Sequence, residues 1–299
     1  MADFAVTFVD PNRLENQGEE EAFPVGIDRR VLAQGDSWFS LGALPPGLTG
    51  NILDGLVLSR SVAVVNCARP GMELRLMVDW MQDPHFMRFL AGGKLAVEFD
   101  AIFLSGGGND LIAAALTAPG AASGPEQQIL LTSAQRGGDT VPVDQYVSAP
   151  GWKAFSDHMA YWFDQLVQQR DSGINRRKPL FFHNYACVMP RPAGAGFGFG
   201  PWLSAAMIAY AVPAQDWLAL SNNLLDRLGQ LLDGIVASAA AKDAGCNVFL
   251  IDTKGQANLV LADPGSTGDS GDFINEIHPN YRGYNKIDAV WRTAVDARI

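Results

Sequence analysis

The feature that most constrains this chain is an alternation between short apolar runs and longer segments of helical period. The runs, rich in Val, Ile, Leu and Phe, lie at 30–33, 61–66, 101–105, 179–184 and 248–252. Continuous apolar runs of this length are typical of strands that are buried on both faces. Because helical segments lie between them, the βαβα order implies a parallel sheet with helices on both sides. The chain is therefore predicted to be an α/β protein.

Four segments carry the helical period most clearly. They lie at 72–90, 155–169, 217–241 and 284–297. In the second segment, Met159, Trp162, Phe163 and Leu166 line one face. Pro84 must interrupt the first segment, because proline has no backbone N–H and its ring clashes with the preceding turn. These segments are predicted to cover the sheet.

Three stretches do not follow this alternation. Residues 1–28 are polar and acidic without a clear period, which predicts an N-terminal arm ahead of a single domain over 29–299. Segments near 117–151 and 189–215 are rich in small residues, Gly and Pro, and each follows a predicted strand. Ligands bind at the carboxyl edge of open parallel sheets. These two loop insertions are thus expected either to wall a substrate cleft or to be surface insertions.

Composition excludes several classes of partner. Of the 299 residues, 48% are hydrophobic and 18% are charged, which is enough apolar material for a large core. The net charge of −10 repels phosphate backbones, so no nucleic acid partner is expected. No apolar run approaches the roughly 20 residues that a membrane span needs.

The expected compartment is the cytoplasm. The sequence does not open with a basic segment followed by an apolar core, so no signal peptide is expected. Cys67, Cys187 and Cys246 form no Cys-x-x-Cys pair, and their odd number gives no disulfide framework. Free thiols are typical of a reducing compartment.

A first chemical signal is Gly35-Asp36-Ser37-Trp38, directly after the first predicted strand. A serine at a strand-to-helix turn lies at the carboxyl edge of the sheet, and the backbone N–H groups there can help to bind an oxyanion. The same Gly-Asp-Ser tripeptide recurs at 268–270, in a run rich in Pro, Gly, Ser and Asp without helical period. This second copy is predicted to be a loop.

A second signal is Ser-Gly-Gly-Gly-Asn-Asp at 105–110, after the third predicted strand. Its glycines allow the backbone to approach a ligand, and the amide of Asn109 can donate to a developing oxyanion. A glycine turn capped by Asn109 or Asp110 is the other interpretation. No Gly-Lys-Ser/Thr follows, so a phosphate loop is not indicated.

The four histidines differ in their settings. His278 lies in a polar loop just before the last predicted helix, where a catalytic base is a reasonable hypothesis. His183 ends a strand at the ligand-binding edge and is expected to line the cleft. His85 and His158 lie on predicted helices and are expected to be structural and solvated, respectively.

Other enzyme classes lack their motifs. No His-Glu-x-x-His, Cys/His cluster or EF-hand spacing is present, so no metal is expected, and no cofactor is indicated. An α/β-hydrolase elbow needs Gly-x-Ser-x-Gly, but Phe39 occupies the last position after Ser37.

Taken in order, four short blocks resemble the SGNH hydrolase superfamily of GDSL-like esterases and lipases. The blocks are Gly-Asp-Ser at 35–37, Asn-Cys-Ala-Arg-Pro-Gly at 66–71, Gly-Gly-Asn-Asp at 107–110 and Ile-His-Pro-Asn at 277–280. The resemblance spans about residues 30–298 and implies a three-layer α/β/α sandwich around a parallel, flavodoxin-like five-stranded sheet. It also implies hydrolysis of carboxylic esters.

The resemblance assigns roles to individual residues. Ser37 would attack the ester carbonyl while His278 takes its proton and later gives it to the leaving alcohol. The backbone N–H groups of Ser37 and Gly71 and the side chain of Asn109 would hold the oxyanion.

Two positions depart from the family pattern. Trp38 replaces a leucine, and Asn275 stands three residues before His278, where the family has an aspartate. Asparagine can accept a bond from the imidazole and fix its tautomer, but it supplies no negative charge. We expect Asn275 to orient His278; Glu276, Asp272 and Asp252 are the alternatives. The same departure leaves open a second function, a ligand-binding protein with the SGNH fold and weak or no activity.

The expected substrate is a small-molecule ester. Phe197, Phe199 and Trp202 in the second loop insertion are predicted to form an apolar wall over the acyl site, which favours small or medium acyl groups or lipid-like esters. The other interpretation is that these aromatic residues cap the core. The sequence does not indicate an oligomeric state.

Overall fold

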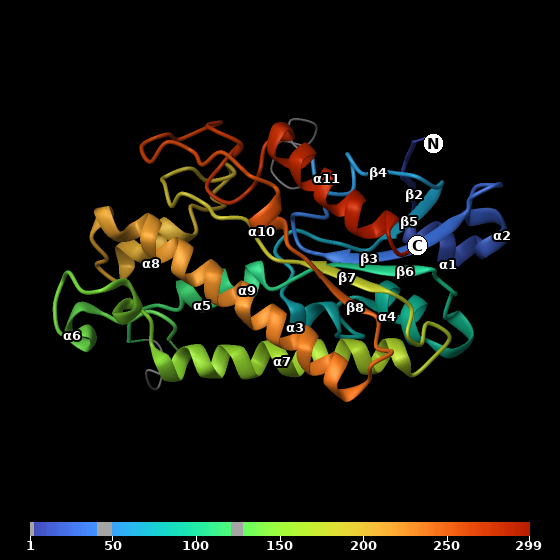
Figure 1. Cartoon of the computed structure of the whole chain (residues 1–299), viewed down its shortest axis with the longest axis horizontal. Coiled ribbons are helices and arrows are strands. Elements are labelled where there is room, and N and C mark those ends of the chain that lie inside the picture. The colour runs from blue at the N-terminus through green and yellow to red at the C-terminus, as the bar shows by residue number, and fades with distance from the viewer. Residues whose placement is uncertain (1–2, 41–49, 121–127) are drawn as a thin grey trace.

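A parallel sheet forms the centre of the computed structural model, which describes residues 3–40, 50–120 and 128–299 (Figure 1). Within these ranges the sheet has six strands in the order β2-β5-β3-β6-β7-β8, and every neighbouring pair is parallel. The strands are β2 (Thr7–Val9), β3 (Arg29–Gly35), β5 (Val62–Asn66), β6 (Ala101–Ser105), β7 (Leu180–His183) and β8 (Val248–Ile251). The last five correspond to the predicted runs. Taken alone they have the order 2-1-3-4-5, which is the flavodoxin-like order, and the predicted fold class is confirmed.

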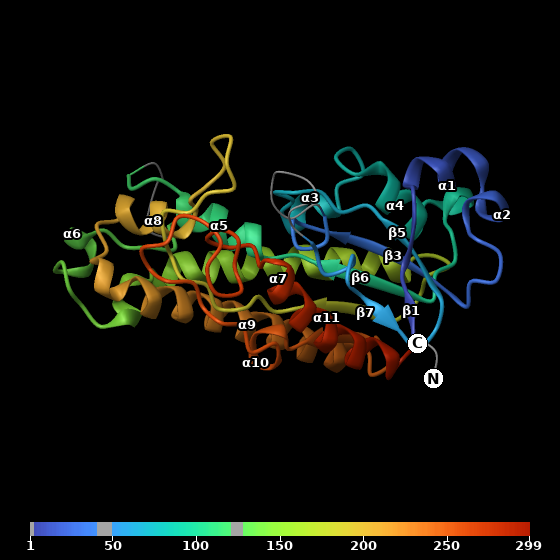
Figure 2. The same cartoon turned by 90° about the horizontal axis from the view of Figure 1, so that it is seen from above.

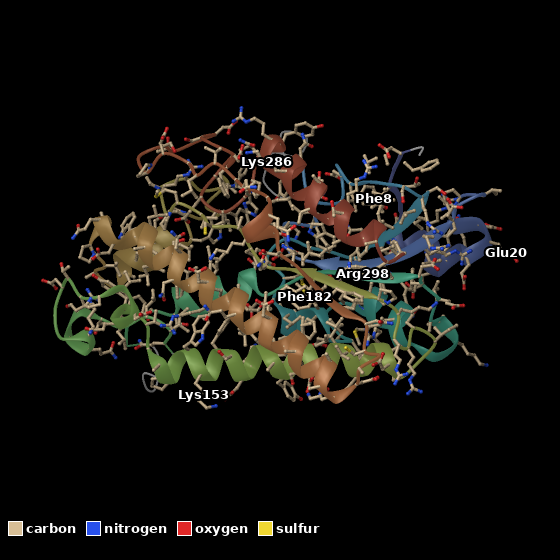
Figure 3. The ribbon with its side chains drawn as sticks, viewed as in Figure 1. Phe8, Glu20, Lys153, Phe182, Lys286 and Arg298 are labelled. Carbon is tan, nitrogen blue, oxygen red and sulfur yellow. The ribbon has the colours of Figure 1, made fainter. Side chains whose placement is uncertain are left out.

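The sheet has one strand more than the five predicted. β2 comes from the region expected to be an arm and pairs with β5 at the edge of the sheet. It has only three residues, and Phe8, labelled in Figure 3, is 45% exposed, so no apolar run indicates it. The same region forms β1 (Phe4–Ala5), which pairs antiparallel with β4 (Val57–Leu58), and the short helices α1 (Pro11–Gln17) and α2 (Glu19–Ala22).

The alternation of side chains along the strands fixes the two helical layers. Phe182 of β7 packs on Phe163 of α7 (Ala149–Asp171), with ring centroids 4.7 Å apart. Phe103 of β6 points to the other face and packs on Trp291 of α11 (Tyr281–Asp296) at 5.4 Å. Because successive residues of a strand face opposite sides, one helix layer covers each face. Figure 1 shows α7 and α11 on opposite sides of the sheet.

The remaining helices are α3 (Leu74–Met77), α4 (Pro84–Ala91), α5 (Gly108–Leu116), α6 (Ser133–Arg136), α8 (Leu203–Ala209), α9 (Trp217–Lys242) and α10 (Thr253–Gln256), with 3-10 turns at Gly93–Leu95, Val143–Tyr146 and Ala214–Asp216. Of these helices, α3, α4 and α9 lie in predicted helical segments, whereas α6 and α8 lie within the two predicted loop insertions and α5 and α10 lie outside any predicted helical segment. The segment predicted at 72–90 is divided between α3 and α4. Pro84 begins α4, and the side chain of Asp83 caps it by accepting from Phe86 N. None of the helices in the described ranges is long and apolar enough for a membrane crossing.

The two predicted loop insertions pack on each other at one end of the molecule (Figure 2). Arg136 is buried and donates to the carbonyl oxygens of Tyr210 (2.9 Å) and Ala211 (2.7 Å). The Tyr210 hydroxyl donates in turn to Thr117 O at 2.6 Å. Residues 121–127 of the first insertion lie outside the described ranges. The second insertion includes α8, which lies against α5 and so brings this end of the molecule beside the carboxyl edge of the sheet.

Candidate active site

Ser37 lies in a tight turn directly after β3. The turn is held by the side chain of Asp36, whose Oδ1 accepts from Trp38 N at 2.9 Å, and by the Asp36 carbonyl, which accepts from Phe39 N at 3.2 Å. Gly35 allows the close approach of β6 here, because a Cβ would lie 2.8 Å from the Cβ of Ser105. Within the described residues the Ser37 N–H donates no hydrogen bond, so it is free to bind an anion.

The structure brings Ser37, His278 and Asn275 together in one hydrogen-bonded row. His278 Nε2 lies 2.7 Å from Ser37 Oγ, and His278 Nδ1 lies 3.0 Å from Asn275 Oδ1. Asn275 Oδ1 also accepts from the backbone N–H groups of Ile277 (3.1 Å) and His278 (2.9 Å), which identifies it as the carbonyl oxygen of the amide. His278 Nδ1 must therefore carry the proton, and Nε2 is the acceptor that faces the serine hydroxyl.

Two alternative carboxylates for orienting His278 have other partners. Asp272 accepts from Val260 N at 2.7 Å and from Lys286 Nζ at 2.6 Å; Lys286 projects from α11 in Figure 3. Asp252 caps α10 by accepting from Gly255 N and also binds Asn184 Nδ2. Neither carboxylate bonds to the imidazole.

Glu276, the third alternative, is buried and bonds to backbone instead of to the imidazole. Its carboxylate accepts from Arg191 N (3.1 Å), from Leu203 N (3.0 Å) and Ser204 N (2.7 Å) at the start of α8, and from Trp202 N. The His278 loop is thereby fastened to the second loop insertion. A buried carboxylate is stable here because backbone donors surround it.

The environment of His278 disfavours its charged form. The imidazole is buried, and burial lowers its pKa to about 4. The indole of Trp202 stands edge-on at 5.4 Å between ring centroids. The side chain that orients the ring, Asn275, is neutral, so no carboxylate in this row opposes the effect of burial.

The proposed oxyanion donors are placed unequally. Asn109 lies in the first turn of α5, and its Nδ2 donates to Met72 O at 3.2 Å, which leaves its second amide hydrogen free. Gly71 is the third residue of a turn closed by Met72 N and Arg69 O at 3.3 Å, and its φ of 79° is one that glycine adopts readily. Asn109 lines the same cavity as Ser37, whereas Gly71 is exposed and lies outside that lining.

A small cavity of about 40 Å³ lies beside Ser37. Most of its walls are apolar and come from α5, α8, α9 and the segments around them. The lining residues are Asp36, Ser37, Trp38, Gly108, Asn109, Leu111, Ile112, Tyr185, Ala186, Val188, Leu203, Leu225 and Ile277. The serine hydroxyl and an oxyanion donor thus border a pocket that suits an apolar group.

The predicted substrate-binding residues do not line this cavity. The prediction for His183 is wrong: its ring is fully buried, with Nε2 2.9 Å from Ser105 Oγ and Nδ1 2.9 Å from Asn184 O. Phe197 and Phe199 lie on a turn of the second insertion, 86% and 59% exposed, so they neither wall the cavity nor cap the core. Trp202 lies beside His278 instead.

Sequence reasoning missed Leu203 and Leu225 as cavity residues. Leu225 belongs to the apolar face of α9, and nothing in its spacing separates a residue that lines a cavity from one that fills the core.

In the described part of the chain, no group of three His, Cys, Asp or Glu side chains is arranged to hold a metal ion. The three cysteines are unpaired, and Cys67 and Cys246 are buried.

Comparison with family models and with curated proteins finds no match. Among solved structures, the chain is similar to a lipase from a goat rumen metagenome, with 16% identity, a TM-score of 0.46, and coverage of 89% of this chain and 97% of that chain. It is also similar to an extracellular lipase from Streptomyces rimosus (13% identity, TM-score 0.46, 91% and 100% covered). An acetylxylan esterase from Geobacillus stearothermophilus has 14% identity and a TM-score of 0.44, with 91% and 96% covered.

The anchoring of the His278 loop by Glu276 predicts a large effect of a small change. Glu276→Gln would turn amide hydrogens toward backbone N–H groups that need an acceptor. We expect the free energy of unfolding in urea to fall by about 1–3 kcal/mol. Glu20→Gln, a change at an exposed position of α2, is the control and should alter it by no more than about 0.5 kcal/mol. Equal unfolding midpoints for the two variants would contradict this account.

Proposed function

We propose that this protein is a serine ester hydrolase in which Ser37 is the nucleophile, His278 the general base and Asn275 the residue that orients His278. The observation that carries the proposal is the 2.7 Å contact between Ser37 Oγ and the unprotonated Nε2 of His278. A hydroxyl within hydrogen-bond reach of an oriented base is the arrangement that activates a serine. The order and chemistry of the four sequence blocks that resemble SGNH hydrolases support the same assignment.

The reaction would proceed through an acyl-enzyme. Ser37 Oγ attacks the ester carbonyl carbon and its proton moves to His278 Nε2. The oxyanion accepts from the Ser37 N–H and from the free amide hydrogen of Asn109, with the unbonded N–H of Gly71 as the proposed third donor. The carbon–oxygen bond of the ester then breaks, and His278 protonates the departing alkoxide. Water, deprotonated by His278, releases the acid and restores Ser37.

Asn275 gives this base a particular character. Because the orienting group is neutral, it fixes the tautomer of His278 without adding a charge that stabilises the imidazolium. His278 is therefore unprotonated and ready to accept a proton throughout the neutral range, but it is a weaker base than an imidazole paired with a carboxylate. This hydrogen-bonded row favours turnover over simple ligand binding. His278 is in the tautomer that catalysis needs, with Nδ1 protonated and Nε2 facing Ser37.

The cavity supports a substrate with a small or medium aliphatic acyl group. Ile112, Leu203 and Leu225 converge on it from three helices, and Ser37 and Asn109 stand at its polar side. An acyl chain that enters the cavity would place its carbonyl near both groups. The unpaired cysteines support a reducing compartment, and we propose the cytoplasm.

Substitutions in the row test the function through hydrolysis of p-nitrophenyl acetate and butyrate. Ser37→Ala should lower kcat/KM by at least about a thousandfold. Asn275→Ala should lower it less, because the ring loses its orientation but keeps Nε2 beside Ser37. Asn275→Asp should keep or raise it, because a carboxylate stabilises the imidazolium.

The pH profile of the same variants gives a second measurement. His278 acts as a base only when unprotonated, so kcat/KM of the wild type should fall on the acid side near pH 4. A carboxylate at 275 favours the protonated ring, so the acid limb of Asn275→Asp should move to higher pH. A fully active Asn275→Ala variant with an unchanged profile would exclude a role for Asn275. A folded wild type without any turnover would favour the binding protein.

The cavity predicts the acyl specificity. Leu225→Phe adds volume to the wall, so kcat/KM for p-nitrophenyl hexanoate should fall about tenfold or more, while the value for acetate changes little. Phe199→Ser, which alters an exposed side chain outside the lining, is the matched control and should keep the wild-type chain-length profile. A fall in kcat/KM for p-nitrophenyl hexanoate in the Phe199 variant alone would place the acyl site at the second insertion instead.

A further inference from the structure

Beneath Ser37 lies a second row of buried polar groups that the proposed reaction does not use. Ser105 Oγ lies 2.8 Å from Asp36 Oδ1 and 2.9 Å from His183 Nε2. The other nitrogen of the imidazole, His183 Nδ1, lies 2.9 Å from Asn184 O. Asp36, Ser105 and His183 are all buried, so water does not complete these bonds from outside. We call these three residues the Asp36 chain.

Counting donors shows how many protons the Asp36 chain needs. Asn184 O can only accept, so His183 Nδ1 must carry a proton. If His183 is neutral, its Nε2 is an acceptor and takes the hydroxyl proton of Ser105. The contact between Ser105 Oγ and Asp36 Oδ1 then has a proton only if the carboxyl supplies it. When Asp36 is protonated, the contacts of Ser105 Oγ with Asp36 and with His183 each have a proton, and only the longer 3.3 Å contact of Ser105 Oγ with the Tyr185 hydroxyl is left without one.

The other assignments are less favourable. An ionised Asp36 beside a neutral His183 leaves one contact of 2.8 or 2.9 Å without a proton, and a buried unpaired contact is costly. An ionised Asp36 with a doubly protonated His183 gives a proton to both of these Ser105 contacts but buries two charges. Burial raises the pKa of Asp36 to about 6 and lowers that of His183 to about 4, so below about pH 6 the proton lies on the carboxyl and not on the imidazole.

The remaining atoms of the carboxyl are also occupied. Asp36 Oδ2 accepts from the Tyr185 hydroxyl, and Oδ1 accepts from Trp38 N in the turn that carries Ser37. Both bonds favour the ionised carboxylate and so oppose the effect of burial on its pKa. Asp36 also lines the cavity beside Ser37, which makes its charge relevant to any anion that forms there.

We propose that the Asp36 chain holds one proton on the Asp36 carboxyl, hydrogen-bonded through Ser105 to a neutral His183 whose Nδ1 is protonated, and that this proton keeps a negative charge away from the oxyanion formed at Ser37. Asp36 is thus a positioning residue that is also held uncharged. The statement about the oxyanion rests on the proposed ester hydrolysis, whereas the location of the proton does not.

Other titratable groups face Asp36 and must be separated from it. They are Asp110 on α5, Tyr284 on α11 and Tyr185, and Asp288 is a further buried carboxyl on α11 that interacts with Tyr284. Burial raises the pKa of Asp110 to about 7 and that of Asp288 to about 9, so these carboxyls also hold protons in the acid range. An experiment must therefore assign its signal to Asp36 by substitution.

The first test locates the proton in the resting protein without a substrate. Infrared spectra of the wild type at about pH 5 should contain a carboxylic acid C=O band that Asp36→Asn removes. Nitrogen-15 spectra of histidine-labelled protein, assigned with His183→Gln, should show His183 protonated at Nδ1 and unprotonated at Nε2. Absence of the Asp36 band, or a His183 protonated at Nε2, would overturn the proposal.

Two variants keep this test decisive. If Asp36→Asn does not fold, Ser105→Ala assigns the band instead, because loss of the hydroxyl that accepts the proton must shift the band. Tyr185→Phe removes a donor that favours the carboxylate, so the pH at which the Asp36 band disappears should rise. A band that responds to neither variant would belong to another carboxyl and would contradict the assignment.

The second test concerns the oxyanion. As pH rises through the midpoint at which the Asp36 band disappears, kcat/KM for p-nitrophenyl acetate should fall. In Asp36→Asn this decrease of kcat/KM with pH should be absent. A constant rate while the band disappears would refute the role in catalysis. If the wild type hydrolyses no ester, the proposed function fails, but the infrared and nitrogen-15 spectra still decide where the proton lies.

Discussion

The rest of the site depends on the hydrogen bond between His278 and Ser37, which joins residues 241 positions apart. One end is fixed by β3 and by the turn around Asp36. The other end is fixed by Asn275, whose backbone carbonyl oxygen accepts from Arg191 Nη2 at 2.7 Å, and by Glu276, which binds the start of α8. A shift of either anchor would separate a base from its nucleophile, and positional errors of about 1 Å are enough to lower catalysis strongly.

A second property of the site is that the two groups proposed to act on Ser37 and His278, Asp36 and Asn275, are neutral in the proposed resting state. Asn275 stands where a carboxylate is usual, burial holds His278 unprotonated, and the Asp36 chain is proposed to bury its carboxyl with a proton. Each of these features avoids a buried charge, and burying a charge without a partner costs free energy. The consequence for catalysis is that, below about pH 6, negative charge would appear at Ser37 only when the oxyanion forms, and the donors of Ser37 and Asn109 can bind it.

Much of the fold could be predicted from the sequence because its core strands are covered on both faces. Such strands form uninterrupted apolar runs, and the five runs gave five strands in the expected order. β2 could not be found in this way, since an edge strand of three residues with Phe8 largely exposed has no such run. Pro84 likewise located the start of α4, and the helical period located α9. Both signals depend only on residues that are neighbours in the sequence.

The site could be predicted only in part. Ser37, Asn109 and His278 carry short motifs, and the structure brings them to one sheet edge, although their roles stay proposals. The position of His183 depends on which way the last residue of β7 faces, and that of Leu225 on how α9 packs against α8. Both positions depend on contacts between segments that are far apart in the sequence, so the local sequence pattern does not predict them. Gly71 is in the expected loop but outside the cavity lining.

The most direct test of the central claim is covalent labelling of the wild type with a fluorophosphonate, followed by intact-mass measurement and peptide mapping. The account predicts a single adduct on Ser37 that Ser37→Ala does not form, and faster labelling of wild type than of His278→Ala. Folded wild type that forms no adduct, or forms it on another serine such as Ser270, would contradict the claim that Ser37 is an activated nucleophile.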